Sequence, residues 1–392
     1  MLVLGGVRMA EVIFWISFAV VVYTYAGYPI AVFCIGRIKD RRLEKSPMYR
    51  PRITILTAAY NEVASIGKTI ENKLRQNYPQ DKLDLIVISD ESTDGTDAIV
   101  ERYAQQTNGR VKLIRQSPRQ GKTAALNMAV SSAAGDILVF SDANSIYESD
   151  TISCLVENFH DAAVGYVTGK MVYTNGDGKG VGDGCSAYMK YENFLRAQET
   201  KVGSIVGVDG GVDAMRKNLF RPMRADQLPD FILPLSVVEQ GYRVVYEARA
   251  IVREESLNTA ADEYRMRVRV SLRALWALFD MRHLLGIGAD GWFAWQLLSH
   301  KVLRYTVFIF IGAAYLSSAY LAFGSAFYLS VFLSENILLL ASFAGYWQDR
   351  NGGATKIFYL PYYFALINIA AAMAFVKFLK REKQTVWKPR TG

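Results

Sequence analysis

Arg52-Ile-Thr-Ile-Leu-Thr-Ala-Ala-Tyr-Asn-Glu62 is an apolar run that ends on an amide and a carboxylate. Two later stretches follow the same plan, Val87-Ile-Ser-Asp-Glu-Ser-Thr-Asp-Gly-Thr-Asp97 and Ile137-Leu-Val-Phe-Ser-Asp-Ala-Asn144. In α/β domains, ligands bind beyond the carboxyl ends of parallel strands. We therefore expect three strand ends in register to form one polar pocket, of the kind that holds a nucleotide.

Strand-like and helix-like segments alternate after Arg52. Strands are expected at 53–58, 83–89, 111–115 and 137–141, and helices at 63–76, 97–106 and 123–133. Strands separated by helices of this length are typical of βαβ units with a largely parallel sheet. The sequence therefore predicts an α/β, Rossmann-like domain. It lacks the Gly-x-Gly-x-x-Gly and Gly-x-x-x-x-Gly-Lys-Ser/Thr loops of dinucleotide-binding and P-loop proteins.

The acidic residues after the strands have two interpretations. Aspartate favours helix N-caps, and capping explains Asp94 and Asp97 at least as well as a ligand role does. Asp90 and Asp142 each close a hydrophobic strand directly, which favours a ligand site.

Two further features suggest a phosphate-bearing ligand. Asp142 and Asn144 place two oxygen donors two residues apart, a spacing suited to a hard cation that is shared with phosphate oxygens. Lys122, with Asn127 further along, adds a cation and an amide before a helix, and a diphosphate needs such partners. A solvated surface lysine is the plain alternative for Lys122.

The N-terminal end is expected to be a membrane anchor. The chain of 392 residues is 51% apolar, and its apolar residues concentrate at the two ends. Residues 12–35 carry no charged side chain, which suffices for one helix to cross a bilayer. No small-residue cleavage site follows, so an anchor is favoured over a signal peptide. The next basic residues should stay in the cytoplasm with the following domain: Arg37, Lys39, Arg41, Arg42 and Lys45.

Three more helices are expected at about 302–322, 326–347 and 357–377. Glu335 falls inside the second, where it either faces the bundle or a polar cavity or lies in a wider polar turn. Three crossings would leave the tail outside, although its basic residues favour the cytoplasm: Lys377, Lys380, Arg381, Lys383, Lys388 and Arg390. Three explanations stay open: a re-entrant last segment, an incomplete pair of spans before it, or an overridden charge rule.

The net charge of +8 does not indicate nucleic acid as a partner. The basic residues cluster beside apolar segments, which suits anionic lipids and phosphates better. The three cysteines and three histidines are dispersed, without metal-ligand spacing. Membrane lipids are therefore expected partners.

Taken in order, the motifs resemble one family. They are Ala59-Tyr-Asn-Glu62, Ser89-Asp-Glu-Ser-Thr-Asp-Gly95, Gly121-Lys122 with Ala125-Leu-Asn127, and Asp142-Ala-Asn144. This set is similar to the GT-A fold of family 2 glycosyltransferases, and most resembles the membrane-bound branch of hyaluronan, chitin, cellulose and poly-N-acetylglucosamine synthases. The resemblance runs from about Arg52 to Leu278.

The resemblance implies a site for a UDP-sugar donor. Asp90 would face the base, and Lys122 would lie near the nucleotide. Asp142 and Asn144 occupy the Asp-x-Asp position that binds a divalent metal, Mg²⁺ or Mn²⁺, and the diphosphate. Asn144 replaces the second Asp, so metal binding is expected to be weaker or completed by another residue. The residues expected to hold the uridine are Ala59, Glu62 and Asp90.

The resemblance also implies an acceptor side. Val208-Asp-Gly-Gly-Val-Asp-Ala-Met-Arg216 looks like the acceptor-lining segment, with Asp209, Gly210 and Gly211 as contacts. Paired glycines permit close backbone approach, and a plain turn is the alternative. Leu228-Pro-Asp-Phe-Ile-Leu-Pro-Leu235 resembles the segment that carries the catalytic base, here Asp230. Asp226 is the rival, and the spacing to Gly241-Tyr-Arg-Val244 favours Asp230.

The segment from Glu263 to Arg273 lies where these synthases carry Gln-x-x-Arg-Trp, and it lacks that motif. A helix there would place Arg265 and Arg269 on one face, and arginines suit phosphate. An amphipathic interfacial helix, with Trp276 toward lipid, explains the same residues without catalysis, and both interpretations can hold.

The expected activity is transfer of a sugar from a UDP-sugar to a glycan hydroxyl with inversion, in polysaccharide synthesis at the cell membrane. Asp230 would be the general base. Single-sugar transfer to a lipid-linked acceptor is one alternative, and a non-catalytic nucleotide-sensing scaffold is another. So few spans leave a homo-oligomer or an export partner open.

The expected organisation has six parts. They are an anchor (1–36), a basic linker (37–51), a GT-A domain (52–258), interfacial helices (259–300), about three membrane helices (301–379) and a basic tail (380–392).

Overall fold

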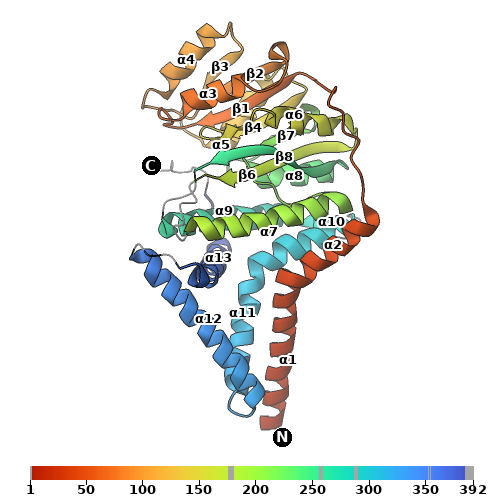
Figure 1. Cartoon of the computed structure of the whole chain (residues 1–392), viewed down its shortest axis with the longest axis vertical. Coiled ribbons are helices and arrows are strands. Elements are labelled where there is room, and N and C mark those ends of the chain that lie inside the picture. The colour runs from red at the N-terminus through yellow and green to blue at the C-terminus, as the bar shows by residue number, and fades with distance from the viewer. Residues whose placement is uncertain are drawn as a thin grey trace.

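The computed structural model describes residues 2–174, 181–255, 259–286, 290–351, 353 and 355–384, without the side chains of 2–4, 181–186 and 356. Figure 1 shows an α/β domain at one end and long helices that extend from it to the other end, where the N-terminus lies. The expectations for the side chain of Cys185 and for Lys388 and Arg390 fall outside these residues.

One eight-stranded sheet forms the domain, in the order β3-β2-β1-β4-β7-β6-β8-β5. β1, β2, β3 and β4 are parallel, β7 is antiparallel to both of its neighbours, and β6 and β8 are parallel. The α/β, Rossmann-like fold is confirmed, with a mixed second half. The strands are β1 Ile53–Ala59, β2 Leu83–Ser89, β3 Val111–Arg115, β4 Ile137–Asp142, β5 Ile146–Tyr147, β6 Val164–Tyr173, β7 Asp213–Arg216 and β8 Arg243–Glu254.

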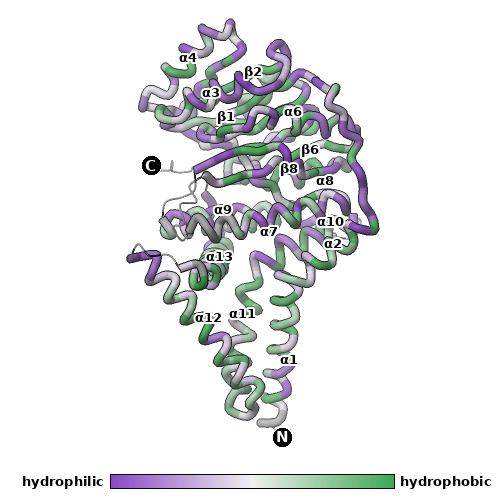
Figure 2. The backbone as a smooth tube through the Cα atoms, in the orientation of Figure 1, coloured by the Kyte–Doolittle hydropathy of each residue, from purple (hydrophilic) through white to green (hydrophobic). Residues whose placement is uncertain are grey.

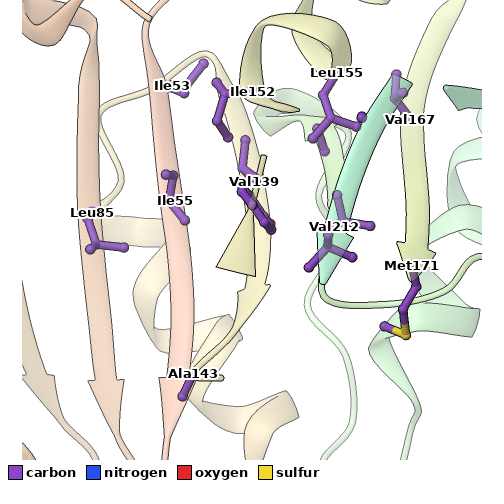
Figure 3. Close-up of a cluster of buried hydrophobic side chains, with 14 of the residues drawn as sticks. Ile53, Ile55, Leu85, Val139, Ala143, Ile152, Leu155, Val167, Met171 and Val212 are labelled. Atoms are coloured by element: carbon purple, nitrogen blue, oxygen red, sulfur yellow. The ribbon is translucent and has the colours of Figure 1, made fainter. Parts of the chain in front are cut away.

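Helices cover both faces of this sheet, so its central strands are apolar on both sides. Ile53 and Ile55 of β1 pack into one core cluster with α3, α4 and α6, and Leu56 packs into the other with α5 and α8. Figure 3 shows the first cluster, where Ile55, Leu85, Val139 and Val212 gather on one face. These helices are α3 Ile66–Leu74, α4 Thr96–Gln106, α5 Lys122–Ser132, α6 Thr151–Val156 and α8 Pro229–Glu239.

Among the residues that the structure describes, four helical segments are long and apolar enough to cross a membrane: Gly5–Lys39, Gly291–Leu321, Ala326–Arg350 and Ile357–Leu379. Figure 2 shows hydrophobic residues along them. The first two are continuous through π-helical turns, η1 Tyr23–Gly27 and η6 Leu298–Val302. The helices involved are α1 Leu2–Val22, α2 Tyr28–Lys39, α10 Gly291–Leu297, α11 Leu303–Leu321, α12 Ala326–Arg350 and α13 Lys356–Leu379.

Two long helices lie between the sheet and this membrane part, α7 Val181–Val202 and α9 Ala260–Asp280 (Figure 1). α7 packs on α2, and α9 packs on α13. The remaining short helices are η2 Gln80–Lys82, η3 Glu157–His160, η4 Lys217–Leu219 and η5 Arg282–Leu285.

Gly135, just before β4, has no room for a side chain. A Cβ there would lie 2.5 Å from both Ile53 C and Thr54 N. Gly135→Ala should therefore destabilise the fold by about 1 to 3 kcal/mol, the usual cost of overpacking. Thermal unfolding in detergent tests this, with Gly312→Ala as the control, because a Cβ at Gly312 meets nothing within 4 Å. Equal melting temperatures for the two variants would contradict the prediction.

Candidate active site

The ends of the three neighbouring strands β1, β2 and β4 meet in register. Ala59 pairs with Ser89, and Ala58 pairs with Asp142. The residues that follow these strands therefore share one edge of the sheet, as the sequence predicted. The edge carries Asn61, Glu62, Asp90 and Asp142.

Asp90 is fully buried and fixes the loop that leads into α5. Its carboxylate accepts hydrogen bonds from Gln120 N at 2.9 Å and Gly121 N at 3.1 Å. Gln116 Nε2 donates a third, at 2.5 Å. Because Lys122 is the first residue of α5, Asp90 also determines where the Lys122 backbone lies.

A flat stack of side chains lies beside Asp90. The Arg119 guanidinium carbon is 3.4 Å from the centre of the Tyr60 ring, and Arg119 Nε lies 3.3 Å from Asp90 Oδ2. Tyr60 follows β1 directly, so the stack stands at the edge where the strand ends meet.

The loops after β1 and β2 brace each other. Glu62 N donates to Thr96 Oγ1 at 2.8 Å, and Asp90 N donates to Ala59 O at 2.8 Å. Gly95 is the N-cap of α4, so neither Asp94 nor Asp97 caps this helix as the plain interpretation expected. Asp94 accepts from Thr96 N at 3.0 Å, just before the helix. Asp97 forms an ion pair with Arg115. Ala59 and Glu62 thus shape this edge, and their contacts with a nucleotide stay a prediction.

Lys122 connects the edge where the strands end, through Asp142, to the first turn of α8, which carries Asp230. Its ammonium lies 2.7 Å from Asp142 Oδ1 and 3.7 Å from Asp230 Oδ1. Burial alone would lower the pKa of Lys122, but the charges of Asp142 and Asp230 raise it above its ordinary value. Lys122 is therefore a permanent positive charge between two carboxylates. Its interpretation as a solvated surface lysine is wrong, because its side chain is only 21% exposed.

Gly210 and Gly211 run through the space between Asp230 and Asp142. Both have positive φ, +74° and +70°, which disfavours any other residue. A Cβ on Gly210 would lie 2.8 Å from Asp230 Oδ2, and one on Gly211 would lie 3.0 Å from Glu254 Oε1. The paired glycines therefore bring the backbone into the site, as expected.

The oxygen donors at this edge fit a divalent cation. A Cβ on Gly211 would lie 3.6 Å from Asp142 Oδ2 and 3.0 Å from Ser145 Oγ, so these oxygens face the space that the glycine leaves. The described residues contain no group of three His, Cys, Asp or Glu that would hold a metal alone. A cation at Asp142 and Asn144 would thus complete its coordination with phosphate and water oxygens, as Mg²⁺ does.

Asp209 is tied into a buried ionic junction. Its Oδ1 lies 2.6 Å from Arg196 Nη1, and burial raises its pKa against the opposing charge of Arg196. Arg196 also lies beside Glu192, which is 2.5 Å from Arg304 on α11. Asp209 thus connects the loop with Gly210 and Gly211 to α11, and its expected contact with an acceptor stays a prediction.

The arginines of α9 differ in their surroundings. Arg265 is exposed and pairs with Asp262, and Arg267 is tied to Glu263 and Tyr363. Arg269 is half buried. The roles of Arg265 and Arg269 toward phosphate stay predictions.

Arg273 on α9, close enough to Asp230 to be influenced by its charge, was not predicted from the sequence. Its guanidinium donates to Gln227 O and, at 3.3 Å, to Thr123 Oγ1. Burial lowers the pKa of Arg273, and the opposite charge of Asp230 acts against this lowering. Its spacing of four residues from Arg269 was the available signal.

The rival candidate, Asp226, is paired with two other cations. Lys383 Nζ lies 2.5 Å from its Oδ2, and Arg224 Nε lies 3.2 Å from its Oδ1. Partial burial would raise the pKa of Asp226, but Lys383 and Arg224 hold it below its ordinary value. Asp230, in contrast, faces Lys122 and Gly210.

Two buried ionisable residues near the site were also not predicted from the sequence, Asp213 and Lys73. Burial, followed by the charge of Asp230, raises the pKa of Asp213 to about 8. Lys73 on α3 is fully buried and donates at 2.8 Å to the backbone oxygen of Ser145, the residue after Asn144. Asp213 lies two residues after Gly211, which was a usable signal. Lys73 gave none, because a lysine on an amphipathic helix is normally exposed.

Part of the chain is similar in sequence to known glycosyltransferases. Residues 54–221 match the family model described as Glycosyl transferase family 2. A beta-monoglucosyldiacylglycerol synthase from Nostoc sp. is 30% identical over 169 residues, 43% of this chain and 36% of the relative. A poly-beta-1,6-N-acetyl-D-glucosamine synthase from Staphylococcus aureus is 27% identical over 222 residues, 55% of this chain and 53% of the relative. The chain thus spans about half or less of these curated relatives.

The fold also matches a solved structure along nearly its whole length. A mannosyltransferase from Pyrobaculum calidifontis, in complex with GDP-Man and Mn²⁺, superposes with a TM-score of 0.74 and 22% identity. The match covers 94% of this chain and 99% of that one. The chain thus has the GT-A fold. Within it, residues 54–221 are similar to family 2 glycosyltransferases.

The raised pKa of Asp213 gives the stability a pH dependence. The unfolded side chain ionises near pH 4, and the folded one near pH 8. Between these values the unfolded state binds fewer protons, so wild-type stability falls as pH rises. Asp213→Asn mimics the protonated acid and lacks this term, so its melting temperature relative to wild type should increase from pH 5 to pH 8.

Thermal unfolding in detergent at several pH values measures this difference. Asp226→Asn is the control, because the pKa of Asp226 is lowered and its relative stability should not increase over the same range. A constant difference between Asp213→Asn and wild type would contradict the assignment.

Proposed function

We propose that the chain is an inverting glycosyltransferase that moves a sugar from a UDP-sugar to a hydroxyl of a saccharide acceptor, in synthesis of an extracellular or cell-envelope polysaccharide. The observation that supports this best is the position of Lys122, whose ammonium contacts Asp142 and lies 3.7 Å from Asp230. A donor-side carboxylate and a candidate base are thus within reach of one side chain. Such proximity is what direct transfer between two substrates requires.

Asp230 is the proposed general base. It would accept the proton of the acceptor hydroxyl while that oxygen attacks the anomeric carbon from the face opposite the diphosphate. Gly210 brings the backbone of its loop against this carboxylate, because a Cβ there would lie 2.8 Å from Asp230 Oδ2. Asp226 is unsuited to the role, because Lys383 and Arg224 already neutralise it.

Positive side chains would stabilise the departing diphosphate. Lys122 is fixed at the donor edge, and Arg265 and Arg269 are the proposed phosphate contacts on α9, followed by Arg273. Asp142 and Asn144 would hold a divalent cation, which when bound neutralises charge on the leaving group. The Tyr60–Arg119 stack offers a flat surface for the nucleobase. The loop that contains Arg119 is held in place by the hydrogen bond from Gln120 N to Asp90.

The acceptor has a second candidate class. The two curated relatives are named for a glucolipid and for a polysaccharide, so a single transfer to a lipid-linked acceptor is the alternative. The contacts of α9 and α13 under the catalytic domain are compatible with either. A non-catalytic scaffold would not need Asp230 beside Lys122 and Asp142.

The catalytic domain is proposed to lie in the cytoplasm, on a multi-pass protein of the cell membrane. α1 would cross from outside, with the basic residues after α2 retained inside.

Asp230→Asn should lower sugar transfer by about 10² to 10⁴-fold, because the base that accepts the hydroxyl proton is lost. Nucleotide affinity should change little, since Asp230 lies on the acceptor side of Lys122. Transfer assays with purified membranes and calorimetric titration with UDP measure the two quantities. Asp226→Asn is the matched control and should retain transfer. Full activity of Asp230→Asn would show that the base is assigned wrongly.

A donor panel separates the proposed functions. UDP-sugars should give Mg²⁺- or Mn²⁺-dependent release of UDP, whereas GDP-mannose, tested as the rival donor, should not release GDP. The Asp142→Ala variant should lose this nucleotide release, because the diphosphate contact is removed. Label from the sugar should appear in polymer for the main proposal, or in organic-extractable lipid for the alternative. Nucleotide release without transfer to any acceptor would instead favour the scaffold.

A further inference from the structure

The last apolar helix, α13, runs along α9 from end to end. Near its start, Tyr363 Oη donates to Glu263 Oε1 at 2.9 Å, in the first turn of α9. Near its end, the Phe378 ring lies 4.7 Å from the ring of Trp276, in the last turns of α9. α9 in turn is bound to the catalytic domain, where Asp280 pairs with Arg224. Both ends of α13 are therefore beside the catalytic domain.

The contacts of α13 with the other membrane helices lie at one level. Its start packs on Gly345, five residues before the end of α12, where a Cβ would lie 2.5 Å from Phe358 O. Its middle contacts Tyr25 in η1, whose ring lies 5.1 Å from that of Phe364. Its end contacts Phe308, close to the start of α11.

Each of these partners is at the domain-side end of its own helix. A helix of 24 residues is about 36 Å long, so a crossing α13 would end near the opposite side of the bundle. The core cluster at that side consists of Phe14, Ala314, Leu321 and Tyr328, and no described residue of α13 belongs to it. Figure 1 likewise shows α13 just below α7 and α9, far from the turn between α11 and α12.

The free face of α13 is apolar along its whole length. The buried residues of α13 include Tyr359, Tyr363, Ala370 and Ala374. The exposed residues of this helix are apolar and spread over a broad arc of its surface: Ile357, Leu360, Phe364, Ile369, Met373, Val376 and Leu379. Basic residues lie at its C-terminal end, at Lys377, Lys380 and Arg381. Exposed apolar side chains beside basic residues fit acyl chains and anionic headgroups at a membrane surface.

The described part of the tail returns to the catalytic domain. Trp276 Nε1 donates to Glu382 O at 2.8 Å, and Lys383 Nζ is 2.5 Å from Asp226 Oδ2. This contact places residues 382–384 on the cytoplasmic side, if the catalytic domain is there.

We propose that α13 lies in the plane of the cytoplasmic membrane surface, with its exposed apolar residues against lipid, and that it does not cross the bilayer. The chain then crosses three times, through α1–α2, α10–α11 and α12, and the basic tail stays on the catalytic side. The proposal rests on the proposed membrane location, and not on the reaction. A helix in the membrane plane differs from the three explanations that the sequence left open, but like a re-entrant segment it keeps the basic tail in the cytoplasm and so satisfies the charge rule.

Labelling of single cysteines with a membrane-impermeant maleimide tests this arrangement. In a chain with Cys34, Cys154 and Cys185 changed to Ser, one cysteine is placed in the tail (Gln384→Cys). Two controls mark the sides: Lys112→Cys in the catalytic domain, and Phe323→Cys at the turn between α11 and α12, where Phe323 is 96% exposed. Gln384→Cys should react in inside-out vesicles, like Lys112→Cys, and stay unlabelled in right-side-out vesicles. Labelling together with Phe323→Cys would overturn the proposal.

A second measurement keeps the native cysteines. A C-terminal green fluorescent protein should fluoresce and a C-terminal alkaline phosphatase should be inactive, and the reverse pattern would show that α13 crosses. Neither readout needs sugar transfer, so failure of the topology and failure of the proposed function are distinguishable.

Discussion

The ammonium of Lys122 is the contact on which the site depends. It joins Asp142, at the end of β4, to Asp230, in the first turn of α8. Two carboxylates this close repel each other unless a cation lies between them, and partial burial strengthens both the repulsion and its compensation. The remaining architecture can be understood as what holds these three groups in place. Parallel pairing fixes Asp142, and Asp90 fixes the loop before Lys122.

The acceptor side is held by charges that are buried more deeply. Asp209, Arg196 and Glu192 form a continuous set that reaches Arg304 at the start of α11. Removing one member would leave an uncompensated buried charge, so the set resists rearrangement. The loop with Gly210 and Gly211, which needs positive φ at both residues, is thereby anchored to the membrane helices. The position of this loop and the position of α11 are thus mechanically linked.

The sequence predicted the polar edge at the ends of β1, β2 and β4 well, because that edge follows from strand periodicity alone. Apolar runs that end on Glu62, Asp90 and Asp142 leave few alternatives once the strands are parallel. Lys73 and Asp213 could not be found in this way, since their burial results from packing between distant segments. Arg273 was missed for a related reason: helical spacing gives the face of α9, but not which arginine on that face reaches Gln227.

Hydropathy has a similar limit in the membrane part. It counts apolar residues, and α13 has enough of them to cross a bilayer. What decides its orientation is which ends touch which partners, and those contacts join residues that are far apart in sequence, such as Tyr363 with Glu263 and Lys383 with Asp226. α9 packs on α13 and also contacts the loop that precedes Asp230, where Arg273 donates to Gln227 O. A helix α13 in the membrane plane would therefore connect the lipid surface, through α9, to the segment that carries the proposed base.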